Sequence, residues 1–252
     1  MNSLAVVIIT KNEERNIERC LQSVVSIADE IIVLDSFSTD QTETICKRFP
    51  VQFIQREWEG YSASKNFANS CSSSDYIFSL DADEALSESL LEELKLLKTI
   101  GFTGTYSVNR LTNYLGKWIH HSGWFPDIKP RIFPRLESYW EGEFVHEVLI
   151  HPFQQVTQLK GVLEHYSYYS FEDHRKRADH YSVLTAQKFF AANKRVSFLK
   201  PYLSAVGRFV AMFILKKGFL DGYMGFKIAW ISAQSNIVKY KTLIQLHHES
   251  KT

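Results

Sequence analysis

The sequence predicts an α/β protein whose first hundred residues form a mostly parallel sheet flanked by helices. Apolar runs of strand length alternate there with segments whose apolar residues recur at helical spacing. Polar and acidic residues gather directly after three of these apolar runs. The chain has 252 residues, 45% of them hydrophobic, which is enough to bury a large core.

The elements can be placed in order along the chain. Residues 4–9 form an unbroken apolar run, as expected of a strand that is buried on both faces. Ile17, Cys20, Leu21 and Val24 then recur at the spacing of an amphipathic helix. The expected strands span residues 4–9, 30–34, 51–55 and 75–80, and the expected helices span residues 17–25, 39–49 and 61–71.

Three polar segments fall at the predicted carboxyl ends of strands. Residues 10–13 follow the first strand, residues 35–40 the second, and Asp81 and Asp83 the fourth. Ligands of parallel α/β sheets bind beyond these strand ends, so we expect the three segments to surround one site. Side chains two apart on a strand point the same way, so Asp81 and Asp83 can close on one divalent cation.

Several common nucleotide sites are excluded by the positions of the glycines. No glycine occurs before Gly60. A dinucleotide fingerprint and a P-loop both need glycines directly after the first strand. The Gly-x-Ser-x-Gly nucleophile elbow is absent as well. A nucleotide would therefore be held by side chains and a metal ion.

At four places the chain resembles the nucleotide-sugar half of family 2 glycosyltransferases, namely residues 10–13, 35–42, 60–66 and 80–84. Residues 144–147 (Phe-Val-His-Glu) and 165–168 (His-Tyr-Ser-Tyr) further resemble bacterial lipopolysaccharide-core glucosyltransferases. The resemblance covers roughly residues 4–185. It implies a GT-A fold, an inverting transfer from a nucleotide-diphosphate sugar such as UDP-glucose, and a Mg²⁺ or Mn²⁺ ion.

For the donor, the resemblance implies that Thr10 and Glu13 line the base and ribose pocket. Asp35 would accept a hydrogen bond from the base, and Lys65 would lie near the diphosphate. Structural alternatives exist for three of these residues. Asp35, like Asp40, can cap the second helix. Glu13 can be a first-turn acid favoured by the helix dipole, and Lys65 can be a solvated helix charge.

For the metal, the resemblance implies Asp83 and His165 as ligands and places Asp81 against ribose or the ion. The alternative for His165 is a core histidine packed beside Tyr166. A cation bound here would neutralise charge on the departing diphosphate.

The segment between residues 105 and 151 is rich in aromatic side chains and holds three of the five tryptophans. Aromatic rings beside polar groups suit sugars, so we expect Trp124 to contact substrate; a small hydrophobic subcore would use the same residue types. Asp127, Arg131 and Arg135 follow at strand-like spacing and are candidates for contacts to acceptor or phosphate.

An inverting transfer needs a carboxylate that accepts the proton of the acceptor hydroxyl. The candidates in this segment are Asp127, Glu141, Glu143 and Glu147. We favour Glu147, because His146-Glu147 follows an apolar strand end and matches the resemblance. The segment lacks the Glu-Asp dipeptide that many relatives carry there, so the sequence alone leaves all four open.

The C-terminal region is basic and amphipathic. Between Lys194 and Lys241 it has nine Lys and Arg residues and one acid, Asp221. A basic amphipathic helix with aromatic residues is typical of contact with anionic lipid; the alternative is a helix that packs on the catalytic core. The apolar run at residues 209–215 is too short to span a bilayer.

We therefore expect a GT-A domain at residues 1–190, with a nucleotide-sugar half (1–100) and an acceptor half (101–190), followed by helices at 191–252. The expected activity is an inverting, metal-dependent transfer of a hexose from a UDP-sugar to a saccharide or lipid-linked acceptor of the cell envelope. The expected location is cytoplasmic, at the inner face of the cytoplasmic membrane. Nucleic acid is not an expected partner, because the crevice is acidic. The alternatives are a non-catalytic nucleotide-sugar or saccharide-binding module and a nucleotidyltransferase, which would release pyrophosphate.

Overall fold

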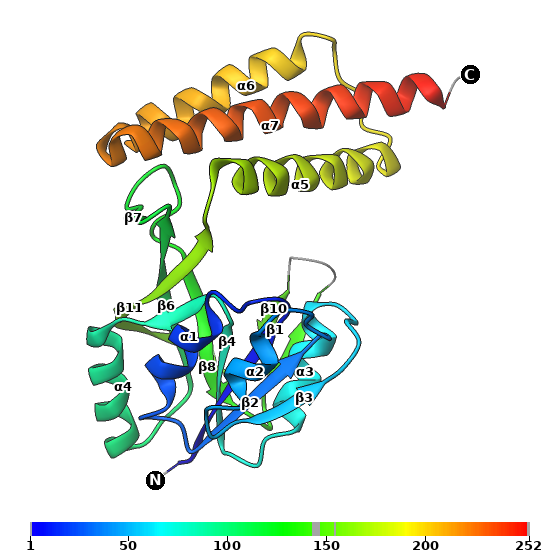
Figure 1. Cartoon of the computed structure of the whole chain (residues 1–252). Helices are drawn as coiled ribbons and strands as arrows, with labels where there is room; N and C mark the ends of the chain where they lie inside the picture. The colour runs from blue at the N-terminus through cyan, green and yellow to red at the C-terminus, as the bar shows by residue number, and fades with distance from the viewer. Residues whose placement is uncertain (1, 143–146, 154, 251–252) are drawn as a thin grey trace. The chain divides into compact units, whose positions relative to one another are not determined.

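The computed structural model describes residues 2–142, 147–153 and 155–250 (Figure 1). The chain forms two compact units. The first consists of Met1–Leu111 and Asp127–Tyr166, and the second of Thr112–Pro126 and Ser167–Thr252.

Four parallel strands begin the first unit, in the spatial order β3-β2-β1-β4. They are β1 (Leu4–Thr10), β2 (Glu30–Asp35), β3 (Gln52–Gln55) and β4 (Tyr76–Asp81). The connecting helices are α1 (Ile17–Val24), α2 (Thr42–Cys46) and α3 (Tyr61–Ser70). The alternation predicted from the sequence is confirmed, and with it the α/β fold.

Helix α2 is shorter than the expected span of residues 39–49. At its start, the Asp40 carboxylate accepts hydrogen bonds from the backbone N–H and the hydroxyl of Thr42, which holds residues 40–42 in a turn. At its end, Pro50 disfavours a helical backbone at Phe49. The expected span was too long at both ends, because the turn at Asp40 and the effect of Pro50 on Phe49 limit the helix to Thr42–Cys46.

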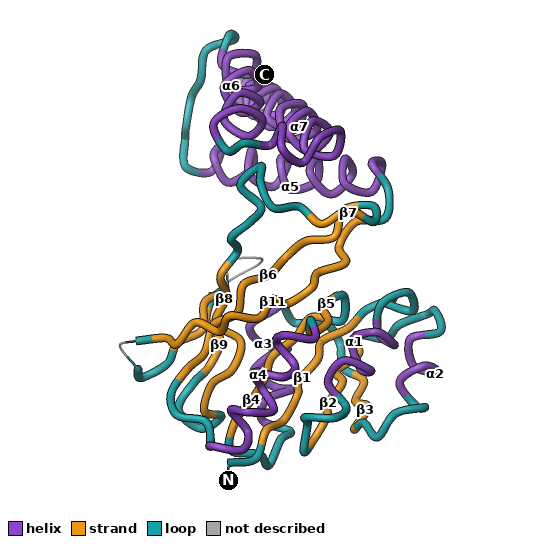
Figure 2. The backbone as a smooth tube through the Cα atoms, turned by 90° about the vertical axis from the view of Figure 1, so that its left-hand side faces the viewer, coloured by secondary structure: helices purple, strands orange, loops and turns teal. Residues whose placement is uncertain are grey.

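Beyond β4 the sheet becomes antiparallel. It continues with β8 (Ile128–Pro134), β6 (Thr105–Tyr114), β11 (Val156–Tyr168) and β5 (Glu84–Leu86), drawn among the orange strands of Figure 2. Strand β7 (Lys117–Trp118) pairs with the end of β6. Strands β9 (Tyr139–Glu141) and β10 (Val148–Ile150) form a separate two-stranded sheet. The antiparallel strands bring Arg131 of β8 next to Asp81 and His165 of β11 next to Asp83, at the end of β4.

Helices cover both faces of the parallel strands. On one face α1 and α4 (Glu88–Ile100) enclose a buried core that includes Leu21 and Leu90. On the other face α3 packs through Ala68. Gly161 of β11 permits a close approach to α4, because a Cβ there would lie 2.4 Å from the Leu90 Cα. Burial on both faces explains the unbroken apolar sequences of β1 and β2.

The second unit is built around three helices that lie side by side in both views (Figures 1 and 2). They are α5 (Phe171–Ala191), α6 (Lys200–Val210) and α7 (Gly222–Glu249). A π-helical turn (Ala211–Leu215) and a 3-10 turn (Gly218–Asp221) connect α6 to α7. Helix α5 packs along α7, so it groups with the C-terminal helices, whereas the sequence-based boundary lies at residue 190. No helix in the described ranges is both long and apolar enough to cross a membrane.

An aromatic cluster around His174 fills the core of this unit. The Nδ1 atom of His174 lies 2.7 Å from the Tyr114 hydroxyl, and the rings of Trp124 and Tyr168 pack against the imidazole. Burial lowers the pKa of His174 to about 4, because the charged imidazolium is poorly solvated there. The folded protein therefore holds His174 neutral at mildly acidic pH.

We expect acid to destabilise the protein through His174. Its pKa is about 6.5 in the unfolded chain and about 4 when folded, so the unfolded state takes up the proton first. The contribution of neutral His174 to the free energy of unfolding is fully present above pH 6.5. It falls by up to about 3 kcal/mol as the pH drops toward 4. His174→Gln keeps a hydrogen-bonding group but cannot titrate, so its free energy of unfolding should fall less over that interval in denaturant titrations. If the free energy of unfolding fell equally with pH in the wild type and in His174→Gln, His174 would not be the source of the acid sensitivity.

Candidate active site

The carboxyl ends of β1, β2 and β4 lie side by side, as the sequence predicts. Thr10 is paired in register with Asp35, and Ile9 with Asp81. Asp35 is fully buried and accepts hydrogen bonds from the backbone N–H of Ser38 (2.8 Å), the Ser38 hydroxyl and the Gln55 amide (3.2 Å). Asp35 does not cap α2: the N-cap residue Gln41 makes no side-chain cap hydrogen bond, and the backbone N–H of Thr42 donates to Asp40 instead.

Thr10 contributes an unsatisfied polar atom beside Asp35. Its side chain is buried, and within the described part of the chain its hydroxyl has no hydrogen-bond partner. Buried polar groups are nearly always hydrogen-bonded, so this hydroxyl at a strand end indicates a partner outside the described residues. A bound ligand at this edge of the sheet would provide one.

Reciprocal hydrogen bonds join the loop after β1 to the loop after β2. The backbone N–H of Asn12 donates to the Ser38 hydroxyl, and the N–H of Thr39 donates to the Asn12 amide oxygen, both at 2.8 Å. The carboxylate of Glu13 accepts from the Asn16 amide at 2.7 Å, directly before α1. These contacts fix Glu13 at the rim of the Thr10–Asp35 edge.

A chain of alternating charges surrounds the end of β4. Asp81 lies 3.4 Å from the Lys65 ammonium and 3.1 Å from the Arg131 guanidinium. Arg131 also pairs at 2.5 Å with Glu84, which is fully buried and lies 3.4 Å from Arg110. Burial alone would raise the pKa of Asp81, but Lys65 and Arg131 outweigh it and hold this pKa far below its usual range. Asp81 is therefore a fixed negative charge.

Glu84 and Arg110 take part in this site although the sequence analysis did not single them out. Glu84 accepts a hydrogen bond from the backbone N–H of Asp81 at 2.9 Å, in addition to its pairs with the two arginines. Arg110 links Glu84 to Asp127 through a 2.7 Å ion pair. Glu84 lies in residues 80–84, one of the segments that resemble family 2 glycosyltransferases. No motif or strand end in the sequence points to Arg110.

Lys65 is not a solvated helix charge. Its side chain is only 2% exposed, and its ammonium lies 3.1 Å from Glu147 as well as near Asp81. The ring of Trp140 lies 4.8 Å from the ammonium. Lys65 thus joins a carboxylate of the parallel strands to the favoured base candidate.

Asp83 and His165 form a separate pair. The Asp83 carboxylate lies 3.2 Å from Nε2 of His165, and both side chains are partly exposed. The antiparallel pairing of β11 with β5, which sets His165 opposite Glu84, creates this contact. Asp81 and Asp83 consequently have different partners, although the sequence analysis expected them to close on one ion.

The Asp83–His165 pair fits a divalent cation that is shared with a substrate. Among the described residues no group of three or more His, Cys, Asp or Glu side chains is arranged to hold a metal. A carboxylate oxygen and an imidazole nitrogen are suitable ligands for Mn²⁺, and Mg²⁺ commonly takes one or two carboxylates plus substrate phosphates. The chain thus offers a two-ligand site that substrate oxygens and water would complete.

The remaining base candidates occupy different environments. Asp127 is held by Arg110 and lies 3.5 Å from Lys129. Burial would raise the pKa of Asp127, but Arg110 and Lys129 lower it. Glu141 is exposed on β9, and Glu143, like His146, lies outside the described residues.

Trp124 lies in the second unit, within the aromatic cluster of Tyr114, Tyr168 and His174. The other site residues predicted from the sequence belong to the first unit. The structure therefore brings together Thr10, Glu13, Asp35, Lys65, Asp81, Asp83, Arg131, Glu147 and His165 within one unit. A contact between Trp124 and substrate stays a prediction.

Removing the charge of Glu84 should destabilise the protein strongly. Glu84→Gln leaves the guanidinium of Arg131 buried with less compensation, and breaking such a pair from one side costs about 3–5 kcal/mol. Denaturant titration would measure this loss. Glu92→Gln on the exposed side of α4 is the matched control and should change stability by less than about 0.5 kcal/mol. Equal effects of the two substitutions would show that the buried network contributes nothing specific.

Comparisons with known proteins agree with these observations. A model of the glycosyl transferase family 2 matches residues 5–198. An uncharacterized glycosyltransferase of Rickettsia prowazekii is 29% identical over 269 aligned positions, covering 100% of this chain and 90% of the relative. The lipopolysaccharide core biosynthesis glycosyltransferase LpsC of Rhizobium meliloti is 26% identical, covering 91% of this chain and 90% of LpsC.

Two solved structures are also similar. A fragment of S. aureus TarS (1–349) in complex with UDP has a TM-score of 0.47 and 14% identity, covering 98% of this chain and 92% of that fragment. Glucosyl-3-phosphoglycerate synthase of Mycobacterium tuberculosis with Mn²⁺ and UDP has a TM-score of 0.36 and 25% identity, covering 44% of each chain.

The family match covers the parallel strands from residue 5 onward and every residue of the ion pairs around Asp81 and Asp83. The chain belongs to glycosyl transferase family 2 and is a glycosyltransferase.

Proposed function

We propose that this glycosyltransferase moves a hexose from a UDP-sugar to a saccharide or lipid-linked acceptor, with inversion at the anomeric carbon. The observation that carries this proposal is the gathering of Asp35, Asp81 and the Asp83–His165 pair at adjoining strand ends. The similarity to LpsC supports an acceptor in lipopolysaccharide core or another cell-envelope glycan.

For the donor, we assign the base and ribose to the edge formed by Thr10, Glu13 and Asp35. The unsatisfied Thr10 hydroxyl supports a ligand contact there. Lys65 would face the diphosphate as a compact positive charge. Arg131 is 4% exposed and paired with Asp81. We therefore assign it the role of orienting Asp81 rather than of contacting the donor directly.

For the cofactor, Asp83 and His165 would hold Mg²⁺ or Mn²⁺. The ion would neutralise charge on the departing UDP. Asp81 keeps its negative charge through Lys65 and Arg131, so it maintains the acidic field of this edge at all working pH values.

For the acceptor, Glu147 would take the proton of the attacking hydroxyl. The acceptor oxygen forms a bond to the anomeric carbon while the bond from that carbon to the phosphate oxygen breaks, and UDP leaves on the opposite face. A general base of this kind typically contributes 10²–10⁴-fold to the rate. Asp127 is less suited, because both Arg110 and Lys129 pair with its carboxylate and lower its pKa, whereas Glu147 pairs with Lys65.

We also propose a cytoplasmic location at the inner face of the cytoplasmic membrane. A lipid-linked acceptor would be presented at that surface. The basic, apolar character of the C-terminal helices supports this placement.

A donor screen tests the proposal. UDP-hexoses, GDP-hexoses and the free nucleotides would be compared for thermal stabilisation with and without Mn²⁺, because a specific donor raises the unfolding midpoint by mass action. UDP-glucose or a related UDP-hexose should stabilise most, and UDP should be released on adding acceptor. Stabilisation without turnover would instead favour a non-catalytic binding module, and pyrophosphate release a nucleotidyltransferase.

A further inference from the structure

Helix α6 and the turn after it present an apolar stripe to solvent. Leu203, Val206 and Val210 recur at helical spacing and are all exposed. Ile214 and Leu215 extend the stripe through the π-helical turn, where Leu215 is 74% exposed. Leucine and isoleucine side chains rarely line up on one exposed face without a partner, since each loses the free energy of burial.

The start of α7 carries a second exposed stripe that adjoins the first. Tyr223, Phe226 and Trp230 recur at helical spacing, and Trp230 is 48% exposed. Phe209 of α6 contacts the rings of both Phe226 and Trp230, at 5.8 and 6.4 Å between centroids. Phe213 contacts Phe226 as well. The stripes are therefore joined by aromatic packing into one surface, which we call the α6–α7 apolar face.

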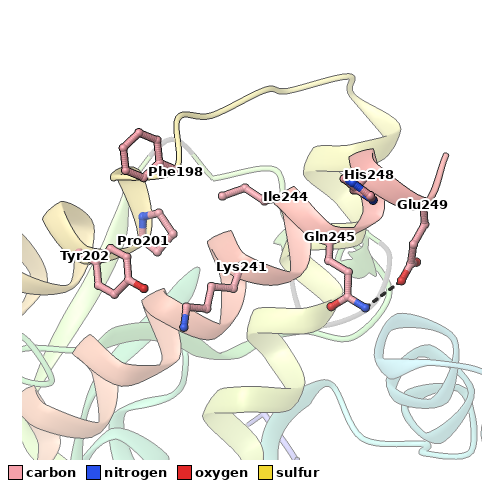
Figure 3. Close-up of a pocket in the computed structure, with 8 residues that line it drawn as sticks. All are labelled: Phe198, Pro201, Tyr202, Lys241, Ile244, Gln245, His248 and Glu249. Atoms are coloured by element: carbon pink, nitrogen blue, oxygen red, sulfur yellow. Dashed lines mark hydrogen bonds between the residues drawn. The ribbon is translucent and has the colours of Figure 1, made fainter. Parts of the chain in front are cut away.

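A cavity of about 370 Å³ lies at the start of α6, next to this face (Figure 3). Tyr202, which is 52% exposed, lines the cavity and directly precedes Leu203 of the face. The cavity is lined by Phe198 and Ile244 together with the ammonium-bearing side chain of Lys241. Figure 3 shows Gln245 donating a hydrogen bond to Glu249 across its other side. The surface near α6 thus offers apolar walls with a cation at the rim.

The charge around the α6–α7 apolar face is one-sided. Residues 194–241 contain nine Lys and Arg residues and a single acid. That acid, Asp221, is buried and accepts hydrogen bonds from the backbone N–H groups of His120 and His121. Lys216 and Lys217, by contrast, are exposed directly after Leu215. Within residues 194–241 no exposed acid offsets these lysines; Glu249, at the end of α7, is the exposed acid that lines the cavity.

We propose that the α6–α7 apolar face docks the enzyme onto an anionic bilayer, with its apolar stripes in the headgroup region and its lysines against lipid phosphates. Aromatic and aliphatic side chains next to basic ones are typical of helices that lie in the membrane interface, and Trp and Tyr favour that depth. A second copy of the chain fits less well, because a two-fold contact would set each basic rim against itself. This docking rests on the proposed location at the membrane face, but it does not depend on catalysis.

Vesicle co-sedimentation of the full-length protein tests the proposal. We expect the protein to pellet with phosphatidylcholine vesicles that contain one quarter phosphatidylglycerol, and to bind pure phosphatidylcholine at least tenfold more weakly. Val206→Ser, Ile214→Ser and Leu215→Ser combined should reduce binding at least tenfold. Lys216→Glu with Lys217→Glu should do the same and remove the salt sensitivity.

Matched controls separate docking from other effects. Leu96→Ser with Ile100→Ser removes equally exposed apolar side chains from α4 and should leave vesicle binding unchanged. Quenching of tryptophan by brominated lipid should be lost in Trp230→Phe. Asp83→Asn should bind vesicles normally, so a failed transferase assay would not bear on this result. The proposal is overturned if the triple variant binds like wild type, or if sedimentation velocity finds a lipid-free dimer that the triple variant abolishes.

Discussion

Asp83→Asn should lower kcat/KM for glycosyl transfer by on the order of 10²–10³-fold, the scale of losing one group that stabilises transition-state charge. The amide replaces a charged oxygen ligand with a neutral one, while Nε2 of His165 stays where it was, 3.2 Å away. A cation held by His165 alone would be retained poorly in the presence of the free nucleotide. The variant should therefore need more Mn²⁺ for half-maximal UDP release, and its activity should recover only in part at saturating metal.

Asp75→Asn is the control for Asp83→Asn. Asp75 directly precedes the amino end of β4, where it accepts hydrogen bonds from the backbone N–H and the hydroxyl of Ser3. The substitution makes the same chemical change at the opposite end of strand β4. It should leave the dependence of the rate on Mn²⁺ unchanged. If Asp83→Asn showed the wild-type rate at every Mn²⁺ concentration, Asp83 would be no metal ligand.

The parallel half of the sheet and its polar edge follow from local sequence patterns. Strands β1, β2 and β4 are buried on both faces, so their sequences are mainly apolar and end at polar residues. Parallel strands that are neighbours end at one edge, so Thr10, Asp35 and Asp81 had to lie together once the alternation was recognised. No knowledge of side-chain contacts was needed for that step.

The ion pairs at this edge could not be predicted in the same way. Arg110 and Arg131 reach Glu84 from strands 26 and 47 residues away, and antiparallel register decides which side chains meet. Lys65 looks like an ordinary helix charge, because its burial depends on Trp140 and Glu147 from later parts of the chain. The pairing of Asp83 with His165 likewise depends on how β11 returns beside β5.

Composition alone could not decide whether Trp124 belongs to a sugar-binding site or to a packed core. Aromatic side chains with polar neighbours are expected both of a sugar site and of a packed core. Trp124 stacks on Tyr168 and contacts His174 within the second unit, so its surroundings are those of the core of that unit. The sequence offers no periodicity that separates the two cases.

Glu147→Gln should lower kcat by on the order of 10²–10⁴-fold while the KM for the UDP-sugar changes little. The amide is nearly isosteric but cannot accept the acceptor proton. It can still accept a hydrogen bond from Lys65, whose ammonium lies 3.1 Å from the Glu147 carboxylate. Single-turnover measurements at saturating donor would isolate this step from UDP release.

A structural role for Glu147 predicts a different kinetic pattern. If the carboxylate served only to orient Lys65, its loss would weaken diphosphate binding and raise the donor KM, with a smaller effect on kcat. The two roles therefore separate in one experiment, because Lys65 also retains Asp81 at 3.4 Å as a second anchor. Glu141→Gln on the exposed strand β9 is the matched control, and its rate should stay at the wild-type value. A loss of kcat in Glu141→Gln but not in Glu147→Gln would assign the proton transfer to the β9 carboxylate instead.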